Sequence, residues 1–173
     1  RHAEAQRDPA LYVGGVTFED DAREGRPVRA IPPRRPGWWR VEGRNASLPT
    51  AAFEAVGGFG TDLEGYGGED VWLGWRLRRA GVPIRGLPSA HVRHVGPDAR
   101  RAGDVAKGAA AGRNAVRIAA LEPATAWRLG VHPLLRRVKR AAFALAGPGL
   151  RASGWRAYEW AYLEASREDA TSP

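Results

Sequence analysis

The first clear pattern along the chain is a run of β-branched and aromatic residues, LYVGGVTF at positions 11–18. A run of this length and composition is typical of a strand. Residues 19–37 then combine an acidic cluster with four prolines, and proline lacks the backbone donor that helices and sheets use. We therefore expect a strand, a long surface loop and then an extended segment at 41–48.

The best-defined pattern is helical and lies at residues 69–80. Acidic side chains occupy its first turn and arginines its last turn, as the helix dipole favours, and the sequence Gly-Val-Pro at 81–83 ends it. Its apolar positions predict a largely buried helix, since they form one wide stripe: Trp72, Leu73, Trp75, Leu77 and Ala80.

Weaker signals predict the remaining elements. A short helix is expected at 51–56, with Thr50 as its N-cap and Gly57 ending it. The glycine-rich segment 58–68 is expected to move and to bring its backbone close to a ligand. Short strands are expected on both sides of a bend at 86–88, and helices in a tail rich in alanine and arginine: strands at 82–84 and 89–95, helices at 103–121, 133–146 and 152–167.

Composition narrows the class of protein. The chain has 173 residues, of which 43% are hydrophobic and 27% are charged, as in an ordinary globular domain with a core. The absence of cysteine excludes disulfides, thiolate metal sites and thiol nucleophiles. No apolar run reaches the ~18–20 residues that span a bilayer. The chain has no methionine and begins with Arg1, so we expect a processed or excised piece or a truncated gene product.

The net charge of +8 is concentrated in the C-terminal part. Residues 1–94 hold 14 basic and 12 acidic side chains, and residues 95–173 hold 13 basic and 7 acidic ones. Such an excess suits an anionic partner, and an arginine-rich coding bias explains it equally well. At 133–146 the basic residues lie beside an apolar stripe, as in a helix on an anionic membrane surface. An aromatic stripe at 155–162 would also suit a bilayer interface. Alternatively, both helices pack on the domain with their arginines facing water.

Two carboxylates are the strongest candidates for chemistry. Glu69 and Asp70 follow a pair of glycines at a helix start, where the helix dipole and free amides favour an ionised carboxylate. Such a group beside a loop-lined cleft can accept a proton from a hydroxyl, which is the task of a general base. The competing explanation is that acidic residues are simply common in a first helical turn.

One histidine is a further candidate. If residues 89–95 form a strand, His94 lies on its inward face with Ala90 and Val92, and His91 lies on the opposite face. An inward imidazole needs either a hydrogen-bond partner or a metal, and both explanations stay open.

The other motifs are weak. The acidic cluster at 19–21 is expected to be a solvated turn, and Asn45-Ala46-Ser47 fits a glycosylation sequon that is common by chance. The sequence holds no P-loop, no dinucleotide-binding glycine motif and no nucleic-acid-binding motif. We therefore expect no nucleic-acid partner.

Four short motifs follow one another in a fixed order: Gly43-x-Asn45-Ala46-Ser47, Phe53-x-x-Val56-Gly57-Gly58-Phe59, Tyr66-Gly67-Gly68-Glu69-Asp70 with Leu73 and Arg76-Leu77, and Gly81 with Pro88-x-Ala90-x-Val92-x-His94. The ordered set resembles the acceptor-side, C-terminal half of inverting family 2 glycosyltransferases of the GT-A fold. It is also similar to the beta-1,4-galactosyltransferases, in which a Gly-Gly-Glu-Asp segment follows an aromatic residue. The resemblance covers residues 43–94 well and 11–42 loosely.

The resemblance implies a role for each matching residue. Asp70 stands where the family has its catalytic base, and Glu69 where a carboxylate helps to hold the acceptor. Tyr66, followed by Gly67 and Gly68, stands where an aromatic residue moves with a substrate-covering loop. His94 stands where a histidine completes the coordination of a divalent cation, Mn²⁺ or Mg²⁺, on the nucleotide diphosphate.

Asn45 lies in a segment that lines the sugar cleft in the family.

Two departures limit the comparison. The galactosyltransferases have further acidic residues after the Glu-Asp pair, where this chain has Val71 and Trp72, and the family's Asp-x-Asp metal motif is absent from this sequence. The resemblance therefore implies that the nucleotide-binding half should precede this segment.

Together these features predict an α/β chain with a partial GT-A fold, in which residues 1–98 form the acceptor-side half with few strands and residues 99–173 a basic helical tail. The expected activity is transfer of a sugar from a nucleotide-sugar donor to the hydroxyl of a sugar or glycoconjugate acceptor, with inversion. We expect a cytoplasmic protein with a peripheral contact to the inner face of the plasma membrane through 133–162. The alternative is a non-catalytic module that docks on a membrane or a partner through the basic tail.

Overall fold

The computed structural model describes residues 9–18, 29–30, 32–96, 99–100, 102–147, 149 and 154–168. The chain divides into two compact units, each described by itself. The first comprises Arg1–Gly60 and Glu69–Pro97, and the second comprises Thr61–Gly68 and Asp98–Pro173. The segment Thr61–Gly68 thus belongs with the C-terminal helices, a grouping that no sequence pattern indicates.

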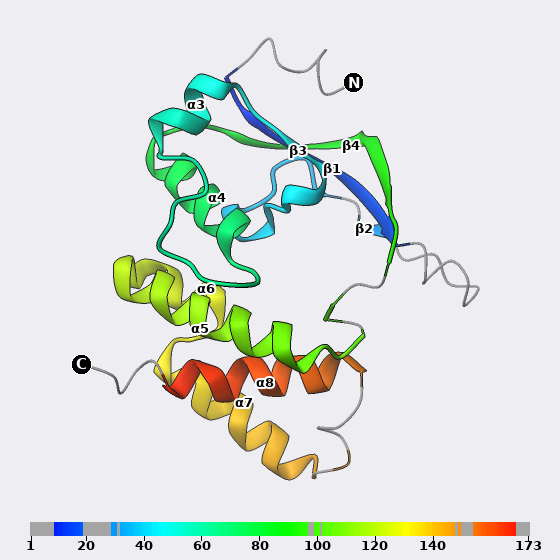
Figure 1. Cartoon of the computed structure of the whole chain (residues 1–173), viewed down its shortest axis with the longest axis vertical. Coiled ribbons are helices and arrows are strands. Elements are labelled where there is room, and N and C mark those ends of the chain that lie inside the picture. Colours follow the sequence, from blue (N-terminus) through cyan, green and yellow to red (C-terminus); the bar gives the residue numbers. More distant parts are fainter. Residues whose placement is uncertain are drawn as a thin grey trace. The chain divides into compact units, whose positions relative to one another are not determined.

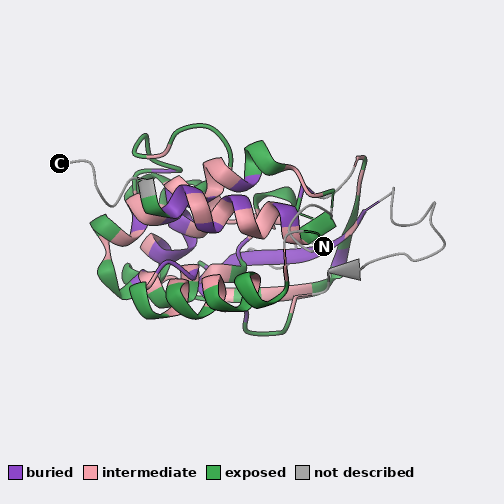
Figure 2. Cartoon of the chain, turned by 90° about the horizontal axis from the view of Figure 1, so that it is seen from below, coloured by how far each residue is buried: buried purple, intermediate pink, exposed green. Residues whose placement is uncertain are grey.

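The first unit is built around β1 (Leu11–Phe18), the predicted strand, which is almost wholly buried (Figures 1 and 2). In the described residues it is the centre of a four-stranded sheet. β4 (Ile84–His94) runs parallel to it, while β2 (Arg29–Ala30) and β3 (Ala46–Ser47) pair with it antiparallel near opposite ends. β2 lies in the stretch expected to be a loop, so that expectation is wrong at these two residues.

β4 is a single strand and not the two strands expected. Leu87 pairs with Gly14 and His91 with Gly15, so residues 88–90 of β4 bulge out between neighbouring residues of β1. A bulge of this kind bends the strand and increases its twist. The bend predicted at 86–88 is therefore an irregularity within one strand.

α4 (Glu69–Arg79) confirms the predicted helix, and its apolar stripe is buried except at Ala80, which follows the last helical residue and is exposed. The core of this unit joins α4 to β1 through five buried side chains: Leu11, Val13, Val41, Leu73 and Leu77. Gly74 lies inside α4 because a Cβ there would be 2.6 Å from the carbonyl oxygen of Trp38. That close approach explains a glycine at a helix position where it normally costs about 1 kcal/mol.

The segment between β2 and α4 is less regular than predicted. The residues expected to be extended include a short 3-10 helix, η2 (Gly43–Asn45), and another, η1 (Trp38–Arg40), precedes it. α3 (Thr50–Ala55) is the short helix expected, but Pro49 occupies its N-cap and Thr50 is its first helical residue.

The second unit contains the three predicted helices, α5 (Val105–Leu121), α7 (Pro133–Leu145) and α8 (Gly154–Glu168). A 3-10 turn, η3 (Pro123–Thr125), and a short helix, α6 (Ala126–Leu129), were not predicted. α5 and α8 lie side by side (Figure 1), with Gly108 of α5 against the backbone of Tyr158 and Gly112 against that of Tyr162. Within the described part of the chain, none of the helices has the length and apolar character that crossing a membrane requires.

Candidate active site

The carboxylate of Asp70 joins two segments of the first unit. It lies in the first turn of α4, where Oδ1 accepts a hydrogen bond from the N–H of Val71 at 2.7 Å. Oδ2 accepts one from the N–H of Gly43, at the start of η2, at 3.2 Å. Amides in the first turn of a helix have no partner within the helix, so the carboxylate satisfies two such donors. A carboxylate has about four acceptor positions, so Asp70 keeps capacity for a further donor.

The electrostatic balance at Asp70 differs from the expectation. Burial raises the pKa of the Asp70 carboxyl above its ordinary value, and the charges of Glu69 and Glu42 raise it further. The hydrogen bonds from Gly43 and Val71 lower the pKa without reversing the shift. The amides favour the ionised form as expected, but desolvation, which the sequence does not reveal, is the larger effect. A carboxylate with a raised pKa is a stronger proton acceptor.

A continuous series of neighbours leads from Asp70 to His94. Arg44 follows Gly43, and its guanidinium lies 4.8 Å from the centre of the Phe18 ring. Phe18 in turn packs edge to face on His94, with 5.4 Å between the ring centres. Phe18 and His94 are the last residues of the parallel strands β1 and β4. Ligands of open α/β sheets bind outside the carboxyl ends of the strands, which is where Phe18 and His94 lie.

His94 is half-buried, and the alternation predicted for its strand holds only in part, because Ala90 is buried whereas Val92 is 36% exposed. His91, the other histidine of β4, lies within hydrogen-bonding distance of the hydroxyl of Thr17. Among the described residues, no group of three or more histidine, cysteine or acidic side chains could hold a metal ion. The described residues therefore do not make a metal site by themselves.

Asn45 is buried at the irregularity between β1 and β4. Its Nδ2 donates to the carbonyl oxygens of Gly15 at 2.8 Å and Ala90 at 3.2 Å. A Cβ on Gly14 would overlap the Asn45 amide, which explains the glycine there. Because both hydrogens of the amide point into the sheet, this placement favours a structural role for Asn45 and leaves its nitrogen unavailable for glycosylation.

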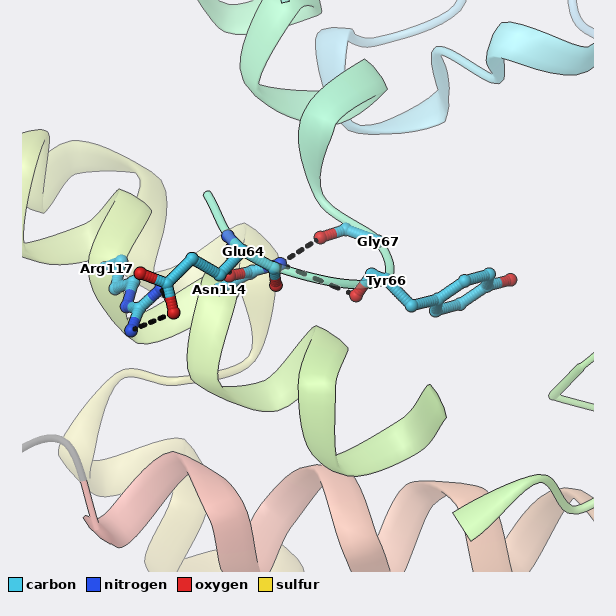
Figure 3. Close-up of polar contacts among 5 residues, drawn as sticks. All are labelled: Glu64, Tyr66, Gly67, Asn114 and Arg117. Carbon is cyan, nitrogen blue, oxygen red and sulfur yellow. Dashed lines mark hydrogen bonds and ion pairs between the residues drawn. The ribbon is translucent and has the colours of Figure 1, made fainter. Parts of the chain in front are cut away.

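Tyr66, Gly67 and Gly68 belong to the second unit, where a side chain of α5 holds the backbone of Tyr66 and Gly67 (Figure 3). The Nδ2 of Asn114 donates to the carbonyl oxygens of Gly67 at 2.7 Å and Tyr66 at 3.5 Å. Tyr66 itself is 40% exposed, with the ammonium of Lys107 5.2 Å from its ring centre. The motif Tyr66–Asp70 is thus divided between the two units, with the boundary after Gly68.

Both glycines of this motif are required by the local backbone. Gly67 and Gly68 have φ angles of 85° and 100°, in the region that only glycine adopts easily. A Cβ on Gly67 would lie 3.2 Å from that of Ala111, and one on Gly68 3.3 Å from Ile118 Cδ1.

Sequence reasoning missed Arg44, Phe18 and Asn114. Phe18 could have been noticed as a ring at the end of an expected strand, and Arg44 as a cation within an expected extended segment. Asn114 is a single amide in a helix otherwise rich in alanine and glycine, which signals a buried hydrogen-bonding role. The acidic cluster at 19–21 lies outside the described residues.

Comparison with known proteins places the central segment near the glycosyltransferases. Residues 31–96 match a family described as the N-terminal domain of galactosyltransferase. This match includes Asn45 and His94 as well as the acidic pair of Glu69 and Asp70. Its description differs from the C-terminal location that the resemblance implies, so the position of this segment within a transferase stays part of the proposal below.

Two curated proteins share a shorter stretch with the chain. The validoxylamine A glucosyltransferases of Streptomyces hygroscopicus subsp. jinggangensis (strain 5008) and subsp. limoneus are each 55% identical over 40 residues, or 23% of this chain. The match covers 10% of the first relative and 9% of the second, so the chain matches about a tenth of each. No solved structure matches significantly. The family and these relatives together support a relation to glycosyltransferases.

Proposed function

We propose that this chain is the acceptor-side part of a GT-A glycosyltransferase, and that Asp70 is its general base. The observation that carries the proposal is the Asp70 carboxylate, which two backbone amides hold in place and whose pKa burial raises. The family match supports the class of reaction because it includes this residue. The proposed donor is a nucleotide sugar, and the proposed acceptor is a hydroxyl of a sugar or glycoconjugate.

The chemistry is a single displacement with inversion at the anomeric carbon. Asp70 accepts the proton of the acceptor hydroxyl while the oxygen forms a bond to the anomeric carbon of the donor. The bond from that carbon to the nucleotide diphosphate breaks, and the diphosphate leaves with the electron pair. General-base assistance from a positioned group contributes about 10²–10⁴-fold to such a rate.

The remaining residues have supporting roles in this proposal. Glu69, exposed beside the base, holds acceptor hydroxyls, and the ring of Tyr66 covers the substrate. His94 supplies one ligand to a divalent cation, and a cation at a leaving diphosphate acts as a Lewis acid. Because the described residues make no complete metal site, no step here depends on it. Asn45 is left out as a substrate contact because its amide bonds within the sheet.

The test is a steady-state transfer assay on the intact protein. Asp70→Asn should lower turnover at least a hundredfold, because the amide cannot accept the proton, while the affinity for the nucleotide stays within about twofold. Glu69→Gln should mainly raise the KM for the acceptor. Glu54→Gln on α3 is the matched control, since this exposed carboxylate lies outside the site. Near-normal turnover of the Asp70 variant would reject the assignment.

A second candidate function is docking on an anionic membrane through α7. Its apolar stripe faces away from the rest of the unit: Leu134 is 56% exposed, Val138 58% and Leu145 90%. Two arginines of α7 also bind within the unit: Arg136 donates to the carbonyl of Ser166, and the partly exposed Arg140 pairs with Glu164.

Other contacts weaken part of the membrane hypothesis. Lys139 pairs with Glu159 of α8 at 3.7 Å, which reduces the positive charge that α7 can offer to a membrane. The Tyr162 hydroxyl donates to the carbonyl of Leu129 at 2.6 Å. Tyr162 is therefore turned inward, and the stripe of α7 is the surface left to test.

Co-sedimentation with vesicles decides this second candidate. The chain should pellet at low salt with phosphatidylcholine vesicles that contain phosphatidylglycerol, and less with phosphatidylcholine alone. Replacing Leu134 and Val138 by Asp should abolish pelleting. Val95→Asp is the control, because Val95 is 79% exposed and lies in the first unit. Equal pelleting of the two variants would exclude the α7 surface.

A further inference from the structure

The buried amide of Asn114 is committed to the loop Thr61–Gly68. Asn114 is 1% exposed, and burying an amide without partners is costly. Its Oδ1 accepts from the N–H of Glu64 at 3.3 Å, and its Nδ2 donates to the carbonyl of Glu64 at 3.0 Å. With the bonds to Tyr66 and Gly67, one side chain pairs with the loop at both ends of residues 64–67 (Figure 3).

The loop needs such an external partner because its own backbone is unusually free. Gly65, Gly67 and Gly68 all adopt positive φ, and glycine loses more conformational entropy on ordering than any other residue. Donors and acceptors from a rigid helix replace the ladder of hydrogen bonds that a strand would have had.

One face of α5 is devoted to this contact. The residues that meet the loop recur at helical spacing, so they lie in one row along the helix: Lys107, Ala111, Asn114 and Ile118. Gly108 and Gly112, on a different face, pack on α8. α5 therefore contacts the loop on one face and packs tightly against α8 on another.

We propose that Asn114 is a positioning residue that holds Thr61–Gly68 in one conformation and thereby fixes Tyr66 as a sugar-binding side chain of the second unit. This inference rests on the proposed function. The ring of Tyr66 combines an exposed apolar face with a hydroxyl, which suits packing against a sugar ring. The helical tail, which lies outside the segment that matches the galactosyltransferase family, then helps to present Tyr66 to a sugar.

The experiment combines hydrogen exchange with kinetics in the intact protein. Asn114→Ala should lower the protection of the Glu64 amide, whose N–H donates to Asn114 Oδ1, at least tenfold and leave the amides of α8 unchanged. It should also raise the KM for the acceptor at least tenfold with little change in the KM for the donor. Arg117→Gln is the control: it removes the ion pair to Glu64, whose side chain is 82% exposed, and both readouts should change less than twofold.

A double variant distinguishes positioning from general stabilisation. Tyr66→Ala alone should raise the KM for the acceptor about as much as Asn114→Ala. Adding Asn114→Ala to Tyr66→Ala should then have little further effect, because the two residues act through one contact. Effects that multiply would overturn the proposal.

The outcomes separate this inference from the proposed function. Unchanged protection of the loop in Asn114→Ala overturns the inference even if the protein transfers sugar. If the wild-type protein transfers no sugar, the proposed function fails, and the link from Asn114 to acceptor binding fails with it. Should Asn114→Ala not fold, the near-isosteric Asn114→Asp keeps the acceptor atom and loses the donor, and it should show the same rise in KM.

Discussion

At the scale of single residues, opposing effects on one carboxylate decide what it can do. Two amides stabilise the charge of Asp70, but burial and two neighbouring carboxylates oppose them and raise its pKa. A surface aspartate in a first helical turn would show the reverse balance. The raised pKa therefore argues against a purely helix-capping role and agrees with a proton acceptor.

This balance predicts a particular pH dependence of stability. Because folding raises the pKa of Asp70, the native state binds this proton more tightly than the unfolded chain. The stability that Asp70 contributes is complete below the pKa of the unfolded chain and is lost as the pH rises through the folded pKa. The free energy of unfolding of wild type relative to Asp70→Asn should thus fall as the pH rises from the ordinary aspartate value of 3.8 through the raised pKa of the folded state. Urea unfolding followed by tryptophan fluorescence measures it. A rise over this range would mean that the two amides outweigh burial.

His94 permits a second test at this scale. Its imidazole ends β4 beside Phe18, and in the proposed function it is one ligand of the divalent cation, which His94→Ala removes. We expect the Mn²⁺-dependent affinity for a nucleoside diphosphate to fall about tenfold or more, as when other single contributors to metal sites are removed. His91→Ala, on the same strand beside Thr17, is the control. Calorimetry in which both variants behave like wild type would leave His94 as a packing residue.

How far the sequence predicts the site depends on what each residue interacts with. Asp70 and Glu69 could be found because motif and helix start coincide at adjacent positions. The buried roles of Asn45 and Asn114 could not, because each binds backbone distant in the sequence: the carbonyls at the β1–β4 irregularity and the loop Thr61–Gly68. Local patterns contain no information on which distant backbone groups lack partners.

At the scale of elements, regular periodicity was predicted well and irregular backbone poorly. α4 has its end signals and apolar stripe in one short stretch, and its bounds follow from them. The two halves of β4 were separated in prediction because a proline and a glycine interrupt the pattern, although pairing with β1 keeps both in one strand. α7 shows the same limit: its amphipathic pattern is real, but which face is exposed depends on α8.

The packing of α5 on α8 predicts whether Gly112→Ala raises or lowers the stability of the protein. In an isolated helix Gly112→Ala would stabilise by about 1 kcal/mol. Here the added Cβ would overlap the carbonyl oxygen of Tyr162, and overpacking costs about 1–3 kcal/mol. We therefore expect a lower melting temperature. Ala106→Gly, at an exposed position of α5, calibrates the helix propensity. A stabilised Gly112→Ala variant would show that the two helices tolerate separation.

At the scale of the whole molecule, the two units are interleaved in sequence. The expected division at residue 98 treats the tail as a separate addition, whereas the second unit also includes Thr61–Gly68 from the middle of the chain. The segment that resembles a transferase therefore contains a loop whose partners, Asn114 among them, lie in the tail. Ending the chain at residue 97 would remove these partners of the loop and leave the sheet of the first unit complete.

Shortening the chain tests this interleaving directly. A chain of residues 1–97 keeps the core that joins β1 to α4, so its far-ultraviolet circular dichroism should retain the signal of that unit. The Glu64 amide should exchange like that of an unfolded chain, because its hydrogen-bond partner on α5 is gone. Adding residues 98–173 as a second chain should restore protection at Glu64, and the same fragment with Asn114→Ala should not. Protection of the loop in the 1–97 chain alone would place it in the first unit and make α5 dispensable for its conformation.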